Sequence, residues 1–150
     1  MPDEFDIAME FAHSRMADAG NDLNALPVPL QTAIRIETMQ GIIDNGGLQY
    51  FFENDFPNNP PYSVFVNDLL RINAVSQAKQ LQASIDCLDL TDPHLNREQR
   101  NQRLTSLWAE ENTEFINAEN QLCGNEDIWV KLRLYTTDNI DVFRPNTTST

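Results

Sequence analysis

NGGLQYFFEN, the ten residues Asn45–Asn54, combines a helix-breaking double glycine with an aromatic run and polar end groups. Asn-Gly can mark a hairpin turn, but a hairpin needs flanks in which polar and apolar residues alternate. The apolar residues of Leu30–Ile43 recur instead with the 3.6-residue period of a helix. The stretch therefore predicts a helix that ends at the glycines, with Asn or Gly in the left-handed conformation, and a short helix that restarts over Leu48–Asn54.

Helical spacing continues through most of the chain on both sides of this break, with loops at 56–61 and 89–96. We expect helices over Phe5–Ala19, from about Pro29 to the break, and over Ser63–Ile72, Val75–Leu88, Arg97–Cys123 and Asp127–Tyr135. A short irregular element is expected at 140–143 and a frayed tail at 144–150. The pattern predicts one compact all-α domain over residues 1–150, with about six to seven helices.

The charge is strongly unbalanced, because 10 Lys and Arg residues face 23 Asp and Glu residues, for a net charge of −13. Direct binding to nucleic acid or to an anionic membrane needs a basic surface, so both are excluded as partners. Acidity alone also serves solubility. The acids, however, fall into three blocks without a base: residues 1–14, the stretch between Arg35 and Arg71, and the stretch between Arg103 and Lys131. If these blocks share a face, they create a negative field suited to a basic protein partner.

The expected location is the cytoplasm. The N-terminus is acidic and lacks the apolar segment of a secretory signal, and the longest apolar runs are too short to span a membrane. Cys87 and Cys123 are isolated in the sequence, which is typical of reduced thiols in a cytosolic protein.

Two glutamates, Glu37 and Glu111, fall on apolar helix stripes. One interpretation is a pair of buried carboxylates with raised pKa, as in acid–base or metal sites. The other, which we favour, places them at the rim of the core or pairs them with Arg35, Arg71 or an indole N–H, because an unpaired buried charge is costly.

Other catalytic patterns are weak or missing. Glu10 and His13 have the Glu-x-x-His spacing of half a helical di-metal site, but His94, the second histidine, lies in a loop. The sequence contains no nucleophile elbow and no phosphate-binding loop. We expect no enzyme activity, no metal and no cofactor. The basic cluster of Arg97, Arg100 and Arg103 is expected to pair locally with acidic residues, with an interface role as the alternative.

The stretch Asn45–Asn54 resembles the signature of a bacterial family of acidic DNA-mimic proteins, first catalogued as a domain of unknown function. The similarity continues through Pro60–Ser63 to Arg71–Ala74 and covers about a third of the chain. Two positions depart from the family pattern: Gln49 is one place closer to the glycines than is usual, and Asn73 replaces a common glycine. Asparagine also adopts the left-handed conformation, so that turn can be kept.

The resemblance implies an all-helical homodimer whose carboxylates stand in for DNA phosphates and capture a DNA-binding protein, such as a transcription factor. Two chains at −13 each carry −26, which compares with about twenty charges per turn of duplex DNA. In this interpretation the signature is scaffold: Asn45, Gly46 and Gly47 break the helix, while Tyr50, Phe51 and Phe52 pack and Gln49 and Asn54 cap.

The expected partner-binding residues are acids from the second and third blocks: Asp44, Glu53, Asp55, Glu110, Glu114, Glu119, Glu126 and Asp127. Two alternatives remain open. One is an immunity-type protein that neutralises a basic toxin or nuclease. The other is an enzyme or a metal- or small-molecule-binding protein that uses Glu37, Glu111 and an aromatic cleft near Tyr50.

Overall fold

The computed structural model describes residues 2–145, and the expected tail lies outside these residues from position 146 onward. The described residues form seven α-helices and three short 3₁₀ helices and contain no strand, which confirms the predicted all-α class. In chain order the elements are α1 (Glu4–Asp18), η1 (Leu23–Ala25), α2 (Val28–Glu53), α3 (Ser63–Arg71), α4 (Val75–Cys87), η2 (Pro93–Leu95), α5 (Arg97–Ala109), α6 (Thr113–Leu122), α7 (Glu126–Asp138) and η3 (Ile140–Phe143).

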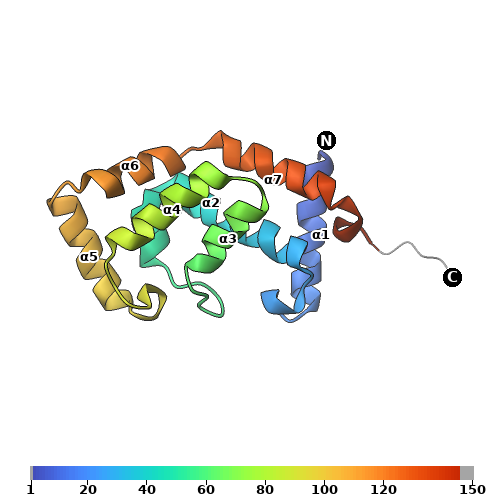
Figure 1. Ribbon diagram of the computed structural model, residues 1–150. Coiled ribbons are helices and arrows are strands. Elements are labelled where there is room, and N and C mark those ends of the chain that lie inside the picture. The colour runs from blue at the N-terminus through green and yellow to red at the C-terminus, as the bar shows by residue number, and fades with distance from the viewer. Residues whose placement is uncertain (1, 146–150) are drawn as a thin grey trace.

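The helices are arranged around α2, which runs through the middle of the molecule (Figure 1). Helices α3 and α4 pack against each other, α3 contacts α2, and α4 lies along α6. Helices α6 and α7 follow one another along one edge, from α5 at one end of the molecule to α1 at the other (Figure 1). Helix α1 contacts both α2 and α7, so the first and last α-helices of the described residues meet.

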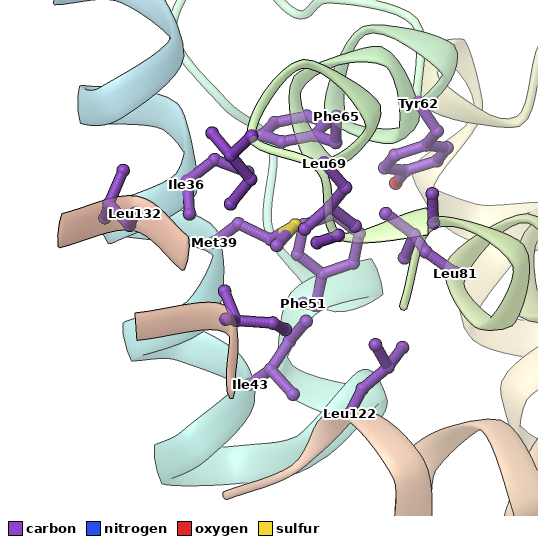
Figure 2. Packing of buried hydrophobic residues seen from close by; sticks show 14 of the residues in the cluster. Ile36, Met39, Ile43, Phe51, Tyr62, Phe65, Leu69, Leu81, Leu122 and Leu132 are labelled. Carbon is purple, nitrogen blue, oxygen red and sulfur yellow. The ribbon is translucent and has the colours of Figure 1, made fainter. Parts of the chain in front are cut away.

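The core forms where α2 meets α3, α4, α6 and α7 (Figure 2). Ile36, Met39 and Ile43 lie one helical turn apart on α2 and are fully buried, because residues three and four apart share one face of a helix. The ring of Phe51 meets that of Phe65 edge to face, with centroids 5.4 Å apart. Edge-to-face contact is a favoured geometry for aromatic pairs, so these rings fix how α3 sits on the second half of α2.

Tyr62 belongs to the same aromatic cluster, and only 4% of its surface is exposed. Burial raises the pKa of its phenol to about 12 from an ordinary value of 10.0, with Asp55 raising it further and Arg100 lowering it. The folded state therefore holds this proton more tightly than the unfolded chain. Its contribution to stability is complete below pH 10 and is lost as the pH rises toward 12.

We therefore expect the wild type to lose about 2 kcal/mol of unfolding free energy between pH 10 and pH 12 through Tyr62. Urea unfolding at several pH values measures this loss. The Tyr62→Phe variant lacks the ionisable hydroxyl and should show a correspondingly smaller decline. Equal declines in the two proteins would contradict the assignment to Tyr62.

Gly47 interrupts α2, as the double glycine predicts. Its backbone has φ 70° and ψ −169° within an otherwise helical segment. The helix that restarts at Leu48 is capped by a distant side chain, because the Leu48 N–H donates to Glu119 Oε1 at 2.9 Å. A side chain at Gly47 would have its Cβ 2.2 Å from the same oxygen. The predicted helix break is confirmed, and it is clamped by α6.

The other signature residues follow the sequence interpretation in part. Phe51 and Phe52 are fully buried, as expected, whereas Tyr50 is 50% exposed, so its predicted packing role is wrong. Tyr50 lies on the outer face of α2. Gln49 does not cap a helix end, since its Oε1 accepts from the Trp108 indole N–H at 2.6 Å and its amide donates to Glu53. Asn54 does cap the end of α2, donating to the Tyr50 carbonyl at 2.6 Å.

The single long helix expected over Arg97–Cys123 is wrong: it is two helices, α5 and α6, separated by a tight turn. The Asn112 N–H donates to the Leu107 carbonyl at 3.0 Å, and Glu111 between them has φ 50°. Asn112 then starts α6 by accepting from the Phe115 N–H at 2.9 Å. This turn places Glu111 on the surface, so the interpretation of Glu111 as a buried carboxylate is wrong.

Candidate functional site

The third acid-only block forms a continuous border of the fold, which we call the acidic edge: the residues from Glu110 to Asp127, comprising the α5–α6 turn, helix α6 and the start of α7. It contains no lysine or arginine, and it follows one side of the molecule (Figure 1). Its carboxylates are those of Glu110, Glu111, Glu114, Glu119, Glu126 and Asp127.

The carboxylates of the acidic edge are more widely spaced than the phosphates of DNA. The ten residues of α6 extend about 15 Å at 1.5 Å per residue. Duplex DNA carries about nine charges over that length. Of the six carboxylates of the acidic edge, only Glu114 and Glu119 lie on α6 itself, so the linear charge density of this helix is well below that of duplex DNA.

Four of the six, Glu110, Glu111, Glu114 and Glu126, are exposed, and their side chains make no hydrogen bond or ion pair with another residue of the range 2–145. Asp127 is exposed as well, but it accepts from Lys131 Nζ at 2.7 Å and from Gln77 Nε2 at 2.9 Å. The bond from Lys131, followed by that from Gln77, holds the pKa of the Asp127 carboxyl below its usual value. Its charge is thus partly compensated within the protein.

Glu119 is committed to the fold. It is half-buried, and its Oε1 accepts from the Leu48 N–H across 71 residues of sequence. A carboxylate at this position accepts a hydrogen bond from one of the free N–H groups where α2 restarts. It also interacts favourably with the positive end of that helix dipole. Glu119 therefore faces α2, and this interior contact was not visible from its position in an acidic block.

Asp44 is also engaged internally, although its side chain reaches the surface. Its carboxylate accepts from Gln40 Nε2 at 2.7 Å, from the Gly124 N–H at 2.8 Å and from the Trp129 indole N–H at 3.1 Å. Gly124 lies between α6 and α7, in the segment 123–125 that we call the elbow. Asp44 therefore fastens the elbow to α2 and fixes the direction in which α7 leaves α6.

Glu53 and Asp55 lie at the end of α2, where α5 packs. Glu53 accepts from Gln49, and Asp55 pairs with Arg100 Nη2 at 2.7 Å. The described contacts place them at the α2–α5 junction and do not join them to the acidic edge. The ion pair confirms the local pairing expected for Arg100.

Helix α4 adds an acid that the sequence analysis did not select. Burial raises the pKa of the Cys87 thiol, and the negative charges of Glu114 and Asp86 raise it further. Asp86 on α4 and Glu114 on α6 therefore both lie within electrostatic range of this thiol. The available signal was a fourth stretch without a base, between Lys79 and Arg97, which contains Asp86.

Several basic residues are turned inward, away from the acidic edge. The guanidinium of Arg35 binds both oxygens of the fully buried Asp68, at 2.6 and 3.1 Å, and Arg71 adds a contact at 3.3 Å. Burial raises the pKa of the Asp68 carboxyl, and the bond from Arg35 opposes that effect. Arg103 donates to the carbonyls at the end of α4, at 3.0 Å each. These cations hold helices together and do little to neutralise the acidic edge.

The two glutamates considered for catalysis lie far apart in the fold. Glu37 is bound to His13 Nε2 at 2.6 Å, between α1 and α2. Glu111 lies in the α5–α6 turn, at the opposite end of the molecule (Figure 1). Within residues 2–145, no group of three or more His, Cys, Asp or Glu side chains is arranged to hold a metal ion. Glu37 and Glu111 therefore do not converge on one substrate.

The protein resembles an established family over most of its length. A family model described as DMP19-like protein matches residues 24–139, from η1 to the residue that ends α7. Searches of curated proteins and of solved structures returned no significant match. Among the described helices, none combines the length and apolar character needed to cross a membrane. Because the family match covers well over half of the sequence, the chain belongs to the DMP19-like protein family.

Proposed function

We propose that this protein is a non-enzymatic, cytoplasmic DNA mimic that captures a DNA-binding protein, such as a transcription factor, on its acidic edge. The observation that carries the proposal is the set of exposed carboxylates along the acidic edge, Glu110, Glu111, Glu114 and Glu126, which form no ion pair among residues 2–145. Membership in the DMP19-like family, a family of DNA mimics, supports it.

The physical basis is electrostatic complementarity. A DNA-binding protein presents lysine and arginine side chains to the phosphates of DNA. These contacts supply most of the part of its affinity that does not depend on the DNA sequence. A folded edge that exposes several carboxylates without neighbouring bases presents negative charge to the same basic surface. Capture would therefore block access to DNA by competition for one basic surface.

The proposal is tested by reversing three of the four carboxylates whose side chains have no internal bond. The variant Glu110→Lys, Glu114→Lys, Glu126→Lys should capture its DNA-binding partner at least about tenfold more weakly, because like charges then face each other. Calorimetry in solution with the partner recovered from the native host measures the loss. Glu119 is excluded from the set, since its replacement would also remove the cap on Leu48.

A matched control changes the same number of charges elsewhere: Glu10→Lys, Asp18→Lys, Asp141→Lys on α1 and η3. It should retain capture and the wild-type melting temperature. Duplex DNA added to the wild-type complex should release the partner. A partner that duplex DNA does not displace, such as a toxin bound elsewhere on the protein, would contradict mimicry.

We propose further that the protein acts as a homodimer. Exposed apolar side chains lie on α1 and α7, two helices that pack together: Ile7 is 56%, Val130 52% and Leu134 58% exposed. Covering these residues against a second copy would remove apolar surface from water. Light scattering that gave the mass of a single chain would contradict the dimer.

A further inference from the structure

A shallow groove opens beside the acidic edge, at the turn between α5 and α6. It has a volume of about 600 Å³ and is lined by Trp108, Glu111, Thr113, Ile116, Asn117 and Asn120. We propose that this groove receives an arginine side chain of the captured protein. The inference rests on the proposed function, because it names the side chain by which that partner is recognised.

The indole of Trp108 is held in one orientation. Its N–H donates to Gln49 Oε1 at 2.6 Å, and its ring meets Phe115 edge to face with centroids 5.3 Å apart. The remaining part of the ring contributes to the groove, where the side chain is half-exposed. A fixed indole face is the best aromatic partner for a cation, and the planar guanidinium of arginine stacks on it.

Glu111 supplies the negative charge next to this ring. It is exposed and makes no ion pair with another residue of the range 2–145. The Glu111 backbone is in the left-handed conformation, with φ 50°. Every other residue with a positive φ in the range 2–145 is a glycine, an asparagine or an aspartate. A carboxylate accepts two parallel bonds from a guanidinium, and this geometry favours arginine over lysine.

The rest of the groove fits the same occupant. Asn117 and Asn120 offer amide oxygens that can accept from the remaining N–H groups of a guanidinium. Glu110 and Glu114 flank the groove, and the nearest bases in sequence, Arg103 and Lys131, lie outside the acidic edge. An anionic or purely apolar ligand would meet unfavourable charge here. The combination of an aromatic face, a carboxylate and amide acceptors selects a cation that is planar and rich in hydrogen-bond donors.

The test uses the indole N–H signals of Trp108 and Trp129, the two tryptophans of the chain, in ¹⁵N NMR spectra of the full-length protein. The Trp129→Phe variant assigns them. The probes are the peptides acetyl-Gly-Arg-Gly-amide, its lysine counterpart and its citrulline counterpart. The Trp108 signal should shift with the arginine peptide at about threefold lower concentration than with lysine, and shift least with the uncharged citrulline peptide.

Two variants separate the groove from the general negative field. Glu111→Gln should weaken the arginine response about threefold, whereas Asp18→Asn, at an exposed carboxylate on α1 outside the acidic edge, should leave it unchanged. Equal responses to arginine and lysine together with an unchanged Glu111→Gln response would overturn the inference. If the proposed function is right, the protein would still capture a DNA-binding partner that duplex DNA displaces. Conversely, an arginine response in a protein that captures no DNA-binding partner would overturn the proposed function and leave the groove as a general arginine site.

Discussion

Gly47→Ala is expected to lower the free energy of unfolding by about 3 kcal/mol. Two costs combine at this position. The backbone at φ 70° and ψ −169° lies in a region that is essentially restricted to glycine. The new methyl group would also lie 2.2 Å from Glu119 Oε1, so the carboxylate must move away and the Leu48 N–H loses its acceptor.

Urea denaturation followed by circular dichroism measures this loss. Gly41→Ala is the matched control, because Gly41 lies in the same helix, has no atom within 4 Å of an added Cβ, and carries no positive φ. That variant should be more stable than the wild type by about 0.5–1 kcal/mol, since alanine is the better helix former. If the two variants changed stability alike, Gly47 would have no special role in the kink.

Arg100→Met is expected to cost about 3–5 kcal/mol, because a carbonyl that loses its donor inside the protein costs about 1–3 kcal/mol and Arg100 donates to three carbonyls. Arg100 is fully buried. It donates to the carbonyls of Phe52, Pro93 and His94 at 2.8, 3.0 and 3.1 Å, and to Asp55 at 2.7 Å. Methionine has a similar length but no donor, so these three carbonyls would lose their partner at the junction of α2, η2 and α5.

Thermal and urea unfolding of the Arg100→Met variant give the magnitude. Arg97→Met is the control, because Arg97 is exposed on the first turn of the same helix and should change stability by no more than about 0.5 kcal/mol. An Arg100→Met variant as stable as the control would mean that water or other donors satisfy the carbonyls without the guanidinium.

The features predicted from sequence are those that depend on local residue chemistry. The break in α2 was predictable because glycine at position 47 is the residue that reaches such a backbone conformation easily. The buried face of α2 was predictable because Ile36, Met39 and Ile43 follow helical spacing, and all three are fully buried. The all-α class follows from the same periodicity, repeated along the chain.

The turn between α5 and α6 was missed because it contains neither glycine nor proline. Glutamate at 111 takes the left-handed conformation that those rules assign to glycine or asparagine. The usable signal was Asn112, which caps α6 through the Phe115 N–H. An asparagine that stands three residues before the first buried residue of an apolar stripe is typical of a helix N-cap. The same pattern is also compatible with the interior of a longer helix.

The negative charge of the candidate surface was predictable from the sequence, but which of its carboxylates are exposed was not. Charge counting selected Asp44 and Glu119 together with Glu110 and Glu114, because all lie in stretches without bases. Their hydrogen-bond donors are remote: Leu48 is 71 residues from Glu119, and Gly124 is 80 residues from Asp44. Such contacts exist only after the chain has folded. The acidic residues of one block therefore divide into those bonded within the fold and those exposed to solvent, and the charge pattern of the sequence does not distinguish the two.

That division determines which carboxylates can be exchanged when a new partner has to be recognised. Asp44 fastens the elbow and Glu119 clamps the kink of α2, so substitutions there would alter the scaffold before they altered recognition. Glu110, Glu114 and Glu126 carry no such duty among residues 2–145. They form a set of positions open to evolutionary drift or to design, at which specificity can be changed while the architecture stays constant.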